Sequence, residues 1–272
     1  ADVPGMANRA AAALQAEGCR AEVESMFAVV VEVCATSLGP RHPVTLTCLN
    51  NFAVCLQGMG KHAAGEPLLR EAFRAREEVL GPAHPDTLTC LNNLAMLLKA
   101  RGRLEEAEPL LRRALAGCEF ALGLEHPCTL LCLNNMAMLL QATGRQPEAE
   151  MHLATALQGS LAAFGPAHPD TATCFNNLGL LLKSVGKTAE AEALYRRALA
   201  AAEAAVGAEH PMALTPLSNL AALLQGLGRH GEAEPLLRQA CAGRAAALGE
   251  EHPETLGALN NLAALFKATG RG

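Results

Sequence analysis

The sequence predicts an all-α protein in which antiparallel helix pairs stack into a solenoid. Three observations predict it: a 42-residue repeat, apolar residues at helical spacing within each repeat, and an aliphatic composition. Half of the 272 residues are apolar and only 3% are aromatic, which suits a core of Leu and Ala. Because a fixed period between about 20 and 50 residues is typical of repeat proteins, one continuous stack over residues 1–272 is expected.

The period is visible in several residue types. Residues 81–122 and 123–164 are identical at 24 of 42 positions without a gap. Three sets keep the same register: Cys48, Cys90, Cys132 and Cys174; His42, His84, His126, His168, His210 and His252, each followed by Pro; and Gly18, Gly60, Gly102, Gly144, Gly186, Gly228 and Gly270. This register predicts a degenerate first helix and a second helix in 1–42, repeats at 43–84, 85–126, 127–168, 169–210 and 211–252, and a first helix of a truncated repeat at 253–272.

Each repeat is expected to contain two helices. In the second full repeat, Pro85 fits the first turn of a helix that runs to about Arg101, because a proline there loses no hydrogen bond. Gly102 is expected to end that helix. A second helix is expected from about Glu105 to Ala121. Apolar residues recur at three- and four-residue spacing in the first helix, at Leu88, Leu91, Leu94, Ala95 and Leu98.

The residues 91–115, LNNLAMLLKARGRLEEAEPLLRRAL, resemble a tetratricopeptide repeat of the long, kinesin light chain-like type. The places that the family gives to large, small and turn residues are held here by Leu91, Leu94, Ala95, Leu98, Gly102, Ala107, Leu111 and Ala114. At the middle position of the second helix, only Phe27 and Tyr195 are aromatic. The resemblance covers essentially the whole chain and implies a right-handed α-solenoid whose first helices line a concave groove.

The register gives seven first helices and six second helices, about thirteen in all. The chain stops at Gly272, directly after a first helix whose apolar residues Leu262, Leu265 and Phe266 lack the next helix. Solenoids normally carry polar capping repeats. We therefore expect either a fragment of a longer protein or an end that packs against another molecule, which includes end-to-end self-association.

Composition argues against several classes of function. A net charge of −5 with scattered Lys and Arg offers no basic stripe for nucleic acid. No apolar stretch reaches the ~18 residues of a membrane span, and no signal peptide opens the chain. Ten cysteines without a CxxC motif are expected to be reduced core thiols. We expect a cytoplasmic protein with no membrane association.

No motif indicates catalysis, a cofactor or a metal. Gly186-Lys187-Thr188 is similar to the end of a phosphate-binding loop, but Leu181 stands where that motif needs glycine. The phased histidines are expected to serve as helix caps, because stacked repeats hold them too far apart to share one ion. The phased glutamates, such as Glu66 and Glu108, are expected to be structural charges in the first turn of the second helices.

Asparagine pairs are the strongest functional signal, because Asn is a poor helix former and yet recurs in the middle of every first helix. An Asn side chain can both donate to and accept from a peptide bond. The alternative is that these amides satisfy backbone groups of neighbouring repeats. The candidate peptide-binding groove consists of Asn50, Asn51, Asn92, Asn93, Met96, Lys99, Asn134, Asn135, Met138, Asn176, Asn177, Lys183, Asn219, Asn260, Asn261 and Lys267.

Neighbouring positions indicate the kind of peptide. Val54, Met96, Met138 and Leu180 form an apolar strip beside the asparagines, and Lys99, Lys183 and Lys267 spread positive charge along it. A partner with hydrophobic and some acidic residues is expected. Kinesin light chains bind aromatic and acidic cargo peptides in a similar groove.

The sequence therefore predicts a protein that is no enzyme: a protein–protein interaction scaffold that binds an extended peptide. Two other functions stay open. The chain could be a structural spacer or self-assembling solenoid, or the sensor or scaffold part of a larger multidomain protein.

Overall fold

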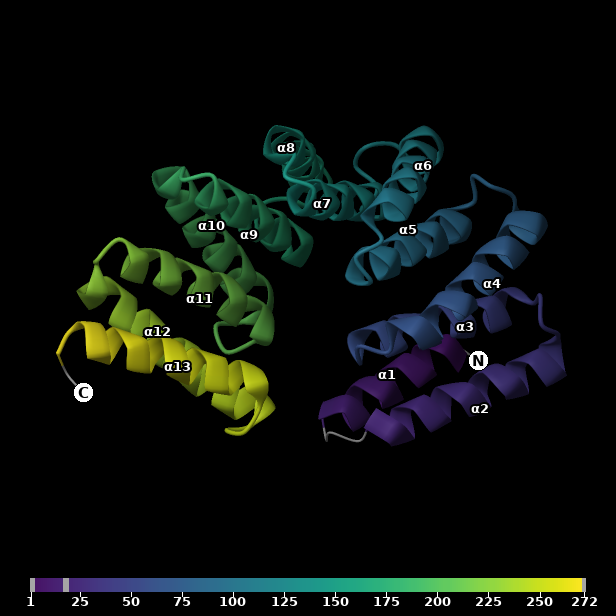
Figure 1. Ribbon diagram of the computed structural model, residues 1–272, viewed down its shortest axis with the longest axis horizontal. Helices are drawn as coiled ribbons and strands as arrows, with labels where there is room; N and C mark the ends of the chain where they lie inside the picture. The colour runs from purple at the N-terminus through teal and green to yellow at the C-terminus, as the bar shows by residue number, and fades with distance from the viewer. Residues whose placement is uncertain (1–2, 17–19, 271–272) are drawn as a thin grey trace. The chain divides into compact units, whose positions relative to one another are not determined.

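The computed structural model describes residues 3–16 and 20–270, so Gly18, Cys19 and Gly272 lie outside the described residues. The described part contains thirteen helices and no strand, which confirms the predicted fold class. The helices are α1 Val3–Ala16, α2 Arg20–Leu38, α3 Pro43–Gly58, α4 His62–Leu80, α5 Pro85–Ala100, α6 Leu104–Leu122, α7 Pro127–Ala142, α8 Gln146–Phe164, α9 Pro169–Ser184, α10 Thr188–Val206, α11 Pro211–Gly226, α12 His230–Leu248 and α13 Pro253–Ala268 (Figure 1).

The His-Pro pairs explain where the odd-numbered helices from α3 onward begin. The histidine has extended backbone angles and its Nδ1 accepts a hydrogen bond from the N–H two residues later, for example from Asp86 to His84 over 3.2 Å. The proline that follows has fixed φ and needs no N–H in the first turn. The cap role expected for these histidines is confirmed at His42, His84, His126, His168, His210 and His252.

Glycines with positive φ explain where the helices end. Gly102 has φ of 76° after α5, and Gly123 has φ of 84° after α6. Residues with a Cβ atom rarely adopt a positive φ, so glycine at these positions allows the helix to end and the chain to turn. The helix end expected at Gly102 is confirmed, and α5 and α6 match their predicted bounds within one or two residues.

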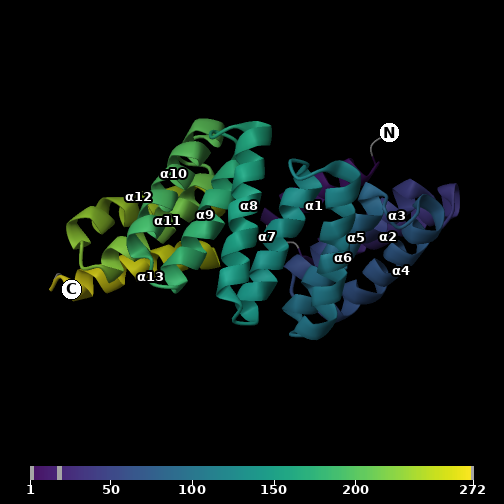
Figure 2. The same cartoon turned by 90° about the horizontal axis from the view of Figure 1, so that it is seen from above.

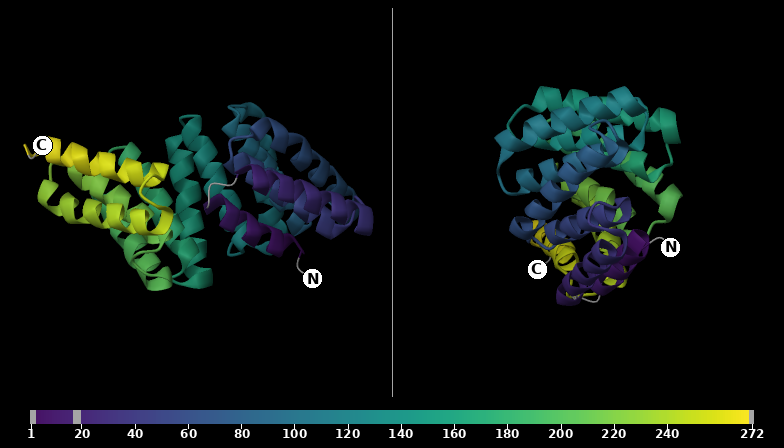
Figure 3. Two further views of the ribbon diagram at one scale, coloured as in Figure 1. Left: turned by 90° about the horizontal axis from the view of Figure 1, so that it is seen from below. Right: turned by 90° about the vertical axis from the view of Figure 1, so that its right-hand side faces the viewer.

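The Cα positions group into two compact units, residues 1–139 and 140–272, and the division falls within α7. In the first unit each helix from α1 to α6 packs against the next. In the second unit the same order holds from α8 to α13, and the pairing of α9 with α10 and of α12 with α13 can be followed in Figures 2 and 3. The prediction of one continuous stack across both units stays a prediction.

Within each unit the odd-numbered helices also contact one another. α1 packs on α3 and α3 on α5 in the first unit, and α9 packs on α11 and α11 on α13 in the second. The even-numbered helices α4 and α6 do not form such a packed pair, and neither do α10 and α12. The odd-numbered helices therefore form a closely joined face of each unit.

The core between the paired helices is built from small residues that face large ones. Ala95 of α5 and Leu111 of α6 are fully buried, as are Ala198 and Tyr195 of α10. Tyr195 lies so close to Gly179 of α9 that a Cβ at Gly179 would be 2.9 Å from the tyrosine Cε1. Glycine therefore makes room for the one tyrosine of the chain.

No helix within residues 3–16 and 20–270 is long and apolar enough to cross a bilayer.

Candidate functional site

The candidate site lies on the odd-numbered helices. Within each unit separately, we use the name odd-helix face for the surface formed by the positions of Thr47, Asn50, Asn51, Val54 and Gln57 of α3 and by the equivalent positions, every 42 residues, on the other odd-numbered helices of that unit. All of the residues expected to form the peptide groove occupy these positions on α3, α5, α7, α9, α11 and α13.

Hydrogen bonds join the asparagine pairs of consecutive odd-numbered helices. Asn93 Nδ2 donates to Asn50 Oδ1 over 3.1 Å, and Asn135 Nδ2 donates to Asn92 Oδ1 over 3.0 Å. The second unit repeats this contact, since Asn219 Nδ2 donates to Asn176 Oδ1 over 2.8 Å. Each of these three bonds spans 43 residues and joins an asparagine at the second position to the asparagine at the first position of the preceding odd-numbered helix. We call this series the asparagine ladder.

The two asparagines of a pair differ in exposure. The first is buried, with 7% of Asn50, 1% of Asn92 and 8% of Asn176 accessible, whereas Asn51, Asn93, Asn135, Asn177 and Asn219 are half-buried. Asn134 is half-buried and donates to the carbonyl of Leu130 over 2.9 Å, and Asn260 and Asn261 are exposed. The alternative left open from the sequence is that the amides satisfy backbone groups of neighbouring repeats. The buried first asparagines do bond to a neighbouring repeat, but in these bonds they accept from asparagine side chains and not from the backbone.

The second asparagines keep hydrogen-bonding capacity toward solvent. Within a pair, Asn92 Nδ2 lies 3.5 Å from Asn93 Oδ1, and Asn50 Nδ2 lies 3.3 Å from Asn51 Oδ1. Asn93 thus uses one of two N–H groups and one of two lone pairs. One donor and one acceptor remain on this half-buried side chain.

Apolar side chains lie beside the ladder. Val54, Met138 and Leu180 are exposed and Met96 is half-buried. Leu131, at the position where most repeats have threonine, is exposed as well. The odd-helix face therefore offers apolar surface next to amides that can still form hydrogen bonds.

The three lysines of the face differ in environment. Lys99 is half-buried, and burial lowers the pKa of its ammonium group below the ordinary value. The Lys99 side chain has no ion-pair or hydrogen-bond partner among the described residues. A carboxylate placed close to it would favour the charged form of the amine. Lys183 and Lys267 are exposed.

A hollow of about 250 Å³ opens in the second unit between α9 and α11. Its walls are Ala172, Thr173, Asn176, Asn177, Met212, Thr215 and Pro216. Pro216 stands inside α11 at a position that is cysteine in four other repeats. Because proline has no N–H, the Met212 carbonyl four residues earlier loses its usual helical partner. The sequence analysis missed this hollow, although the proline was the signal that could have pointed to it.

A buried arginine reaches the odd-helix face of the first unit. Arg76 of α4 is only 3% exposed; it donates from Nη2 to Thr47 Oγ1 over 2.9 Å and from Nη1 to the carbonyl of Asp86 over 2.8 Å. The sequence analysis did not single it out. Its contacts tie α4 to both α3 and α5.

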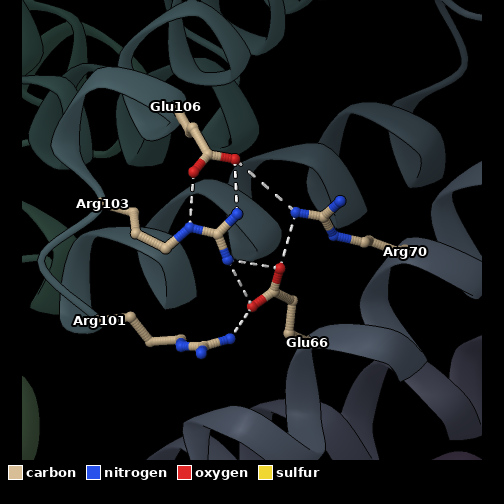
Figure 4. A network of polar contacts seen from close by, with 5 residues as sticks. All are labelled: Glu66, Arg70, Arg101, Arg103 and Glu106. Carbon is tan, nitrogen blue, oxygen red and sulfur yellow. Dashed lines mark hydrogen bonds and ion pairs between the residues drawn. The ribbon is translucent and has the colours of Figure 1, made fainter.

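The phased glutamates have a structural role, but they lie beyond the first helical turn and pair with the next repeat. Glu66 of α4 accepts from Arg103 Nη1 over 2.8 Å and pairs with Arg70 and Arg101, while Arg103 also pairs with Glu106 (Figure 4). Burial alone would raise the Glu66 pKa, but the hydrogen bond from Arg103 and the three arginine charges lower it below its ordinary value. Contacts with the same 37-residue separation join Lys61 to Glu24, Lys187 to Glu150 and Arg229 to Glu192.

Side chains that could bind a metal do not gather in the described part of the chain. It contains no group of three or more His, Cys, Asp or Glu side chains placed to hold an ion. The phased histidines are engaged as helix caps, and the phased glutamates described above are engaged in ion pairs. The arrangement on the odd-helix face suits reversible contact with another chain.

A family model described as "Tetratricopeptide repeat" matches the sequence in five overlapping stretches, residues 50–120, 91–161, 128–204, 185–246 and 212–271. A search of curated proteins gives no match.

Several solved structures are similar. A Podosopora anserina putative kinesin light chain with nearly identical TPR-like repeats is 27% identical, with 75% of this chain and 97% of that chain covered and a TM-score of 0.62. BtubC (BKLC) from P. vanneervenii is 24% identical, with 86% and 94% covered and a TM-score of 0.70. A Rap protein complexed with Competence and Sporulation Factor is 14% identical, with 98% and 85% covered and a TM-score of 0.67. The last two support the fold alone.

Proposed function

The chain belongs to the tetratricopeptide repeat family, and we propose that it is a non-catalytic interaction scaffold that binds an extended peptide segment along the odd-helix face. The observation that carries this proposal is the asparagine ladder with its half-buried second asparagines. A family of repeat scaffolds fits a role in protein interaction, and the Rap protein of similar fold was solved in a complex.

Within this proposal, the second asparagine of each pair contacts the peptide backbone. Asn50, Asn92 and Asn176 are buried, and each accepts a hydrogen bond from the second asparagine on the next odd-numbered helix that holds that side chain in place. A side chain held in this way loses little conformational entropy when it binds. Neighbouring helices lie about 10 Å apart, which corresponds to about three residues of extended peptide. Asn51, Asn93 and Asn135 could therefore contact every third peptide residue.

The side chains around the ladder favour a peptide with hydrophobic and acidic residues. Val54, Met96 and Met138 offer apolar contacts that adapt to different side chains. Lys99 is half-buried, and no carboxylate among the described residues pairs with its ammonium group. A carboxylate of the partner can therefore form a charge-assisted hydrogen bond with Lys99.

The test is selection of peptides from a random library on the whole chain, followed by calorimetry of the selected peptides. Replacing Asn93 and Asn135 together by Ala should weaken every selected peptide at least about tenfold, because backbone contacts do not depend on peptide sequence. Lys99→Met should weaken only peptides that contain Asp or Glu.

Gln158→Ala is the matched control, because this side chain is exposed on the even-numbered helix α8. Affinities that survive the double asparagine change, or fall equally with Gln158→Ala, would remove the odd-helix face from consideration. Light scattering of the same samples tests the alternative of a self-assembling solenoid, which a mass that rises with concentration would favour.

A further inference from the structure

Two pairs of buried cysteines lie with their sulfur atoms almost in contact. Cys34 Sγ of α2 is 3.9 Å from Cys48 Sγ of α3, and Cys118 Sγ of α6 is 3.9 Å from Cys132 Sγ of α7. All four are free thiols buried between helices. In both pairs the cysteines are 14 residues apart, and the second pair follows the first by two repeats.

The other repeats show that this pairing does not follow from the repeat pattern alone. The position of Cys34 and Cys118 is held by Arg76 and Ser160 in the repeats that follow each of them. Those two repeats retain the second cysteine, as Cys90 and Cys174. Cys90 is the equivalent of Cys48 and Cys132, and its Sγ lies 3.5 Å from the carbonyl oxygen of Leu69. The chain thus contains repeats with two cysteines at these positions and repeats with one.

We propose that Cys34 with Cys48, and Cys118 with Cys132, are two sites of reversible disulfide formation that link the second helix of one repeat to the first helix of the next. A disulfide needs an S–S distance of about 2.05 Å, so the two sulfurs must approach by about 1.9 Å, a movement within reach of rotation about the Cα–Cβ bonds. Helices α2 and α3 pack against each other, and the 3.9 Å distance between the sulfurs shows that α6 and α7 are close at Cys118 and Cys132.

The oxidant we assign to these sites is a hydroperoxide such as hydrogen peroxide, which is small enough to reach a buried thiol. One thiolate attacks the peroxide oxygen, the O–O bond breaks, and the sulfur becomes a sulfenic acid while hydroxide leaves. The neighbouring thiol then attacks the sulfenic sulfur, the S–S bond forms, and water leaves. The two thiols are oxidised by two electrons, and one peroxide is reduced to two waters.

The environment indicates which sulfur reacts first. The hydrogen bond from Cys132 lowers the pKa of Cys118, and the same bond together with burial raises the pKa of Cys132. A lowered pKa favours the thiolate, so in this proposal Cys118 attacks the peroxide and Cys132 closes the bridge. In the other pair, burial and the neighbouring Cys34 raise the pKa of Cys48 to about 12, so Cys48 takes the closing role there.

Treatment of the reduced whole chain with hydrogen peroxide in native buffer tests the proposal. Remaining thiols are then alkylated, and the protein is digested and analysed by mass spectrometry. We expect two cross-linked peptide pairs, Cys34 with Cys48 and Cys118 with Cys132, a loss of about 2 Da for each bridge, and full reversal by dithiothreitol. Cys90 and Cys174 should stay outside any bridge.

Matched variants separate the two sites. Cys118→Ser should abolish the second bridge and leave the first, and serine at this position already occurs in the chain as Ser160. Cys34→Ser should do the reverse, and Cys90→Ser should change neither. Bridges that involve Cys90, Cys174, Cys55 or Cys128, bridges that form only after denaturation, or four thiols that end as sulfinic acids without any bridge would overturn the proposal.

Discussion

The two units solve the same packing problem with different residues. In the unit of residues 1–139, two positions of one repeat are held by Ala95 and Leu111, and both side chains are fully buried. In the unit of residues 140–272, Tyr195 is fully buried at the position of Leu111, and Gly179 takes the position of Ala95. The larger ring is matched by the loss of one methyl group on the facing helix. The residue type at this core position therefore depends on the residue 16 positions away on the paired helix, and not only on its position in the repeat.

The largest expected effect comes from breaking this match. Gly179→Ala places a methyl group 2.9 Å from Tyr195 Cε1, so the ring must move, and we expect the free energy of unfolding to fall by about 1–3 kcal/mol. Tyr195→Leu alone should also destabilise the unit by leaving a cavity beside the glycine. Urea denaturation followed by circular dichroism measures both.

The double variant sharpens the comparison. Gly179→Ala combined with Tyr195→Leu recreates the pair Ala95 and Leu111, so it should be more stable than either single variant by at least about 1 kcal/mol. Simple additivity of the two losses would show that the units do not share this packing rule.

A smaller effect is expected from the asparagine ladder. Asn92→Ala removes the acceptor of Asn135 and the neighbour of Asn93 inside the first unit, so we expect a loss of about 1–2 kcal/mol in the free energy of unfolding. Asn176→Ala should cost a similar amount in the second unit, because Asn219 loses its acceptor.

Asn261→Ala is the control for these changes, because Asn261 is exposed on α13, and we expect less than about 0.5 kcal/mol from it. Equal losses for Asn92 and Asn261 in the same denaturation assay would mean that the ladder contributes little to stability.

The smallest expected effect is the difference in stability between variants of two glutamates, Glu66 in the first unit and Glu192 in the second. Glu66 pairs with Arg70, Arg101 and Arg103, whereas Glu192 pairs with Arg196 and Arg229, and Leu227 stands where the first unit has Arg101. Because these arginines are partly exposed, we expect Glu66→Gln to destabilise by only about 1 kcal/mol and Glu192→Gln by somewhat less.

The pH dependence of the Glu66 network has a definite sign. The Glu66 pKa lies below its ordinary value of 4.5 in the folded chain. Its stabilisation is therefore complete above that ordinary value and is lost as the pH falls through the folded pKa. The stability difference between the chain and Glu66→Gln should shrink as the pH falls from 7 to about 3 in thermal melts. A difference that stays constant over this range would contradict the assignment.

The fold could be predicted from the sequence because the residues that start helices, the residues that end them and the apolar residues between them all repeat every 42 positions. His84 and Gly102 mark a helix start and a helix end, and the apolar spacing between them fixes which side is buried. The two-unit division could not be predicted, because Leu139 and Leu140 belong to a stretch that looks like every other first helix.

The candidate site was predicted as a set of positions but not as a set of roles. Asn92 and Asn93 are identical in type and adjacent in sequence, and only the packing of α3 on α5 decides that one is buried and the other half-buried. The hollow beside Pro216 and the buried Arg76 depart from the repeat. A search for the repeated pattern passes over such departures.

The regular spacing of the helix ends has a consequence for how such a chain changes over generations. Glycines with positive φ stand every 21 residues from Gly39 to Gly270; the Glu66–Arg103 and Glu192–Arg229 contacts span 37 residues, and the bonds of the asparagine ladder span 43. Because each repeat contacts its nearest neighbours, loss or duplication of one repeat's coding segment by unequal crossing-over leaves every remaining contact in register. The length of the odd-helix face can then grow or shrink by whole repeats while each rung keeps its geometry, and point substitutions such as Pro216 give single repeats their individuality.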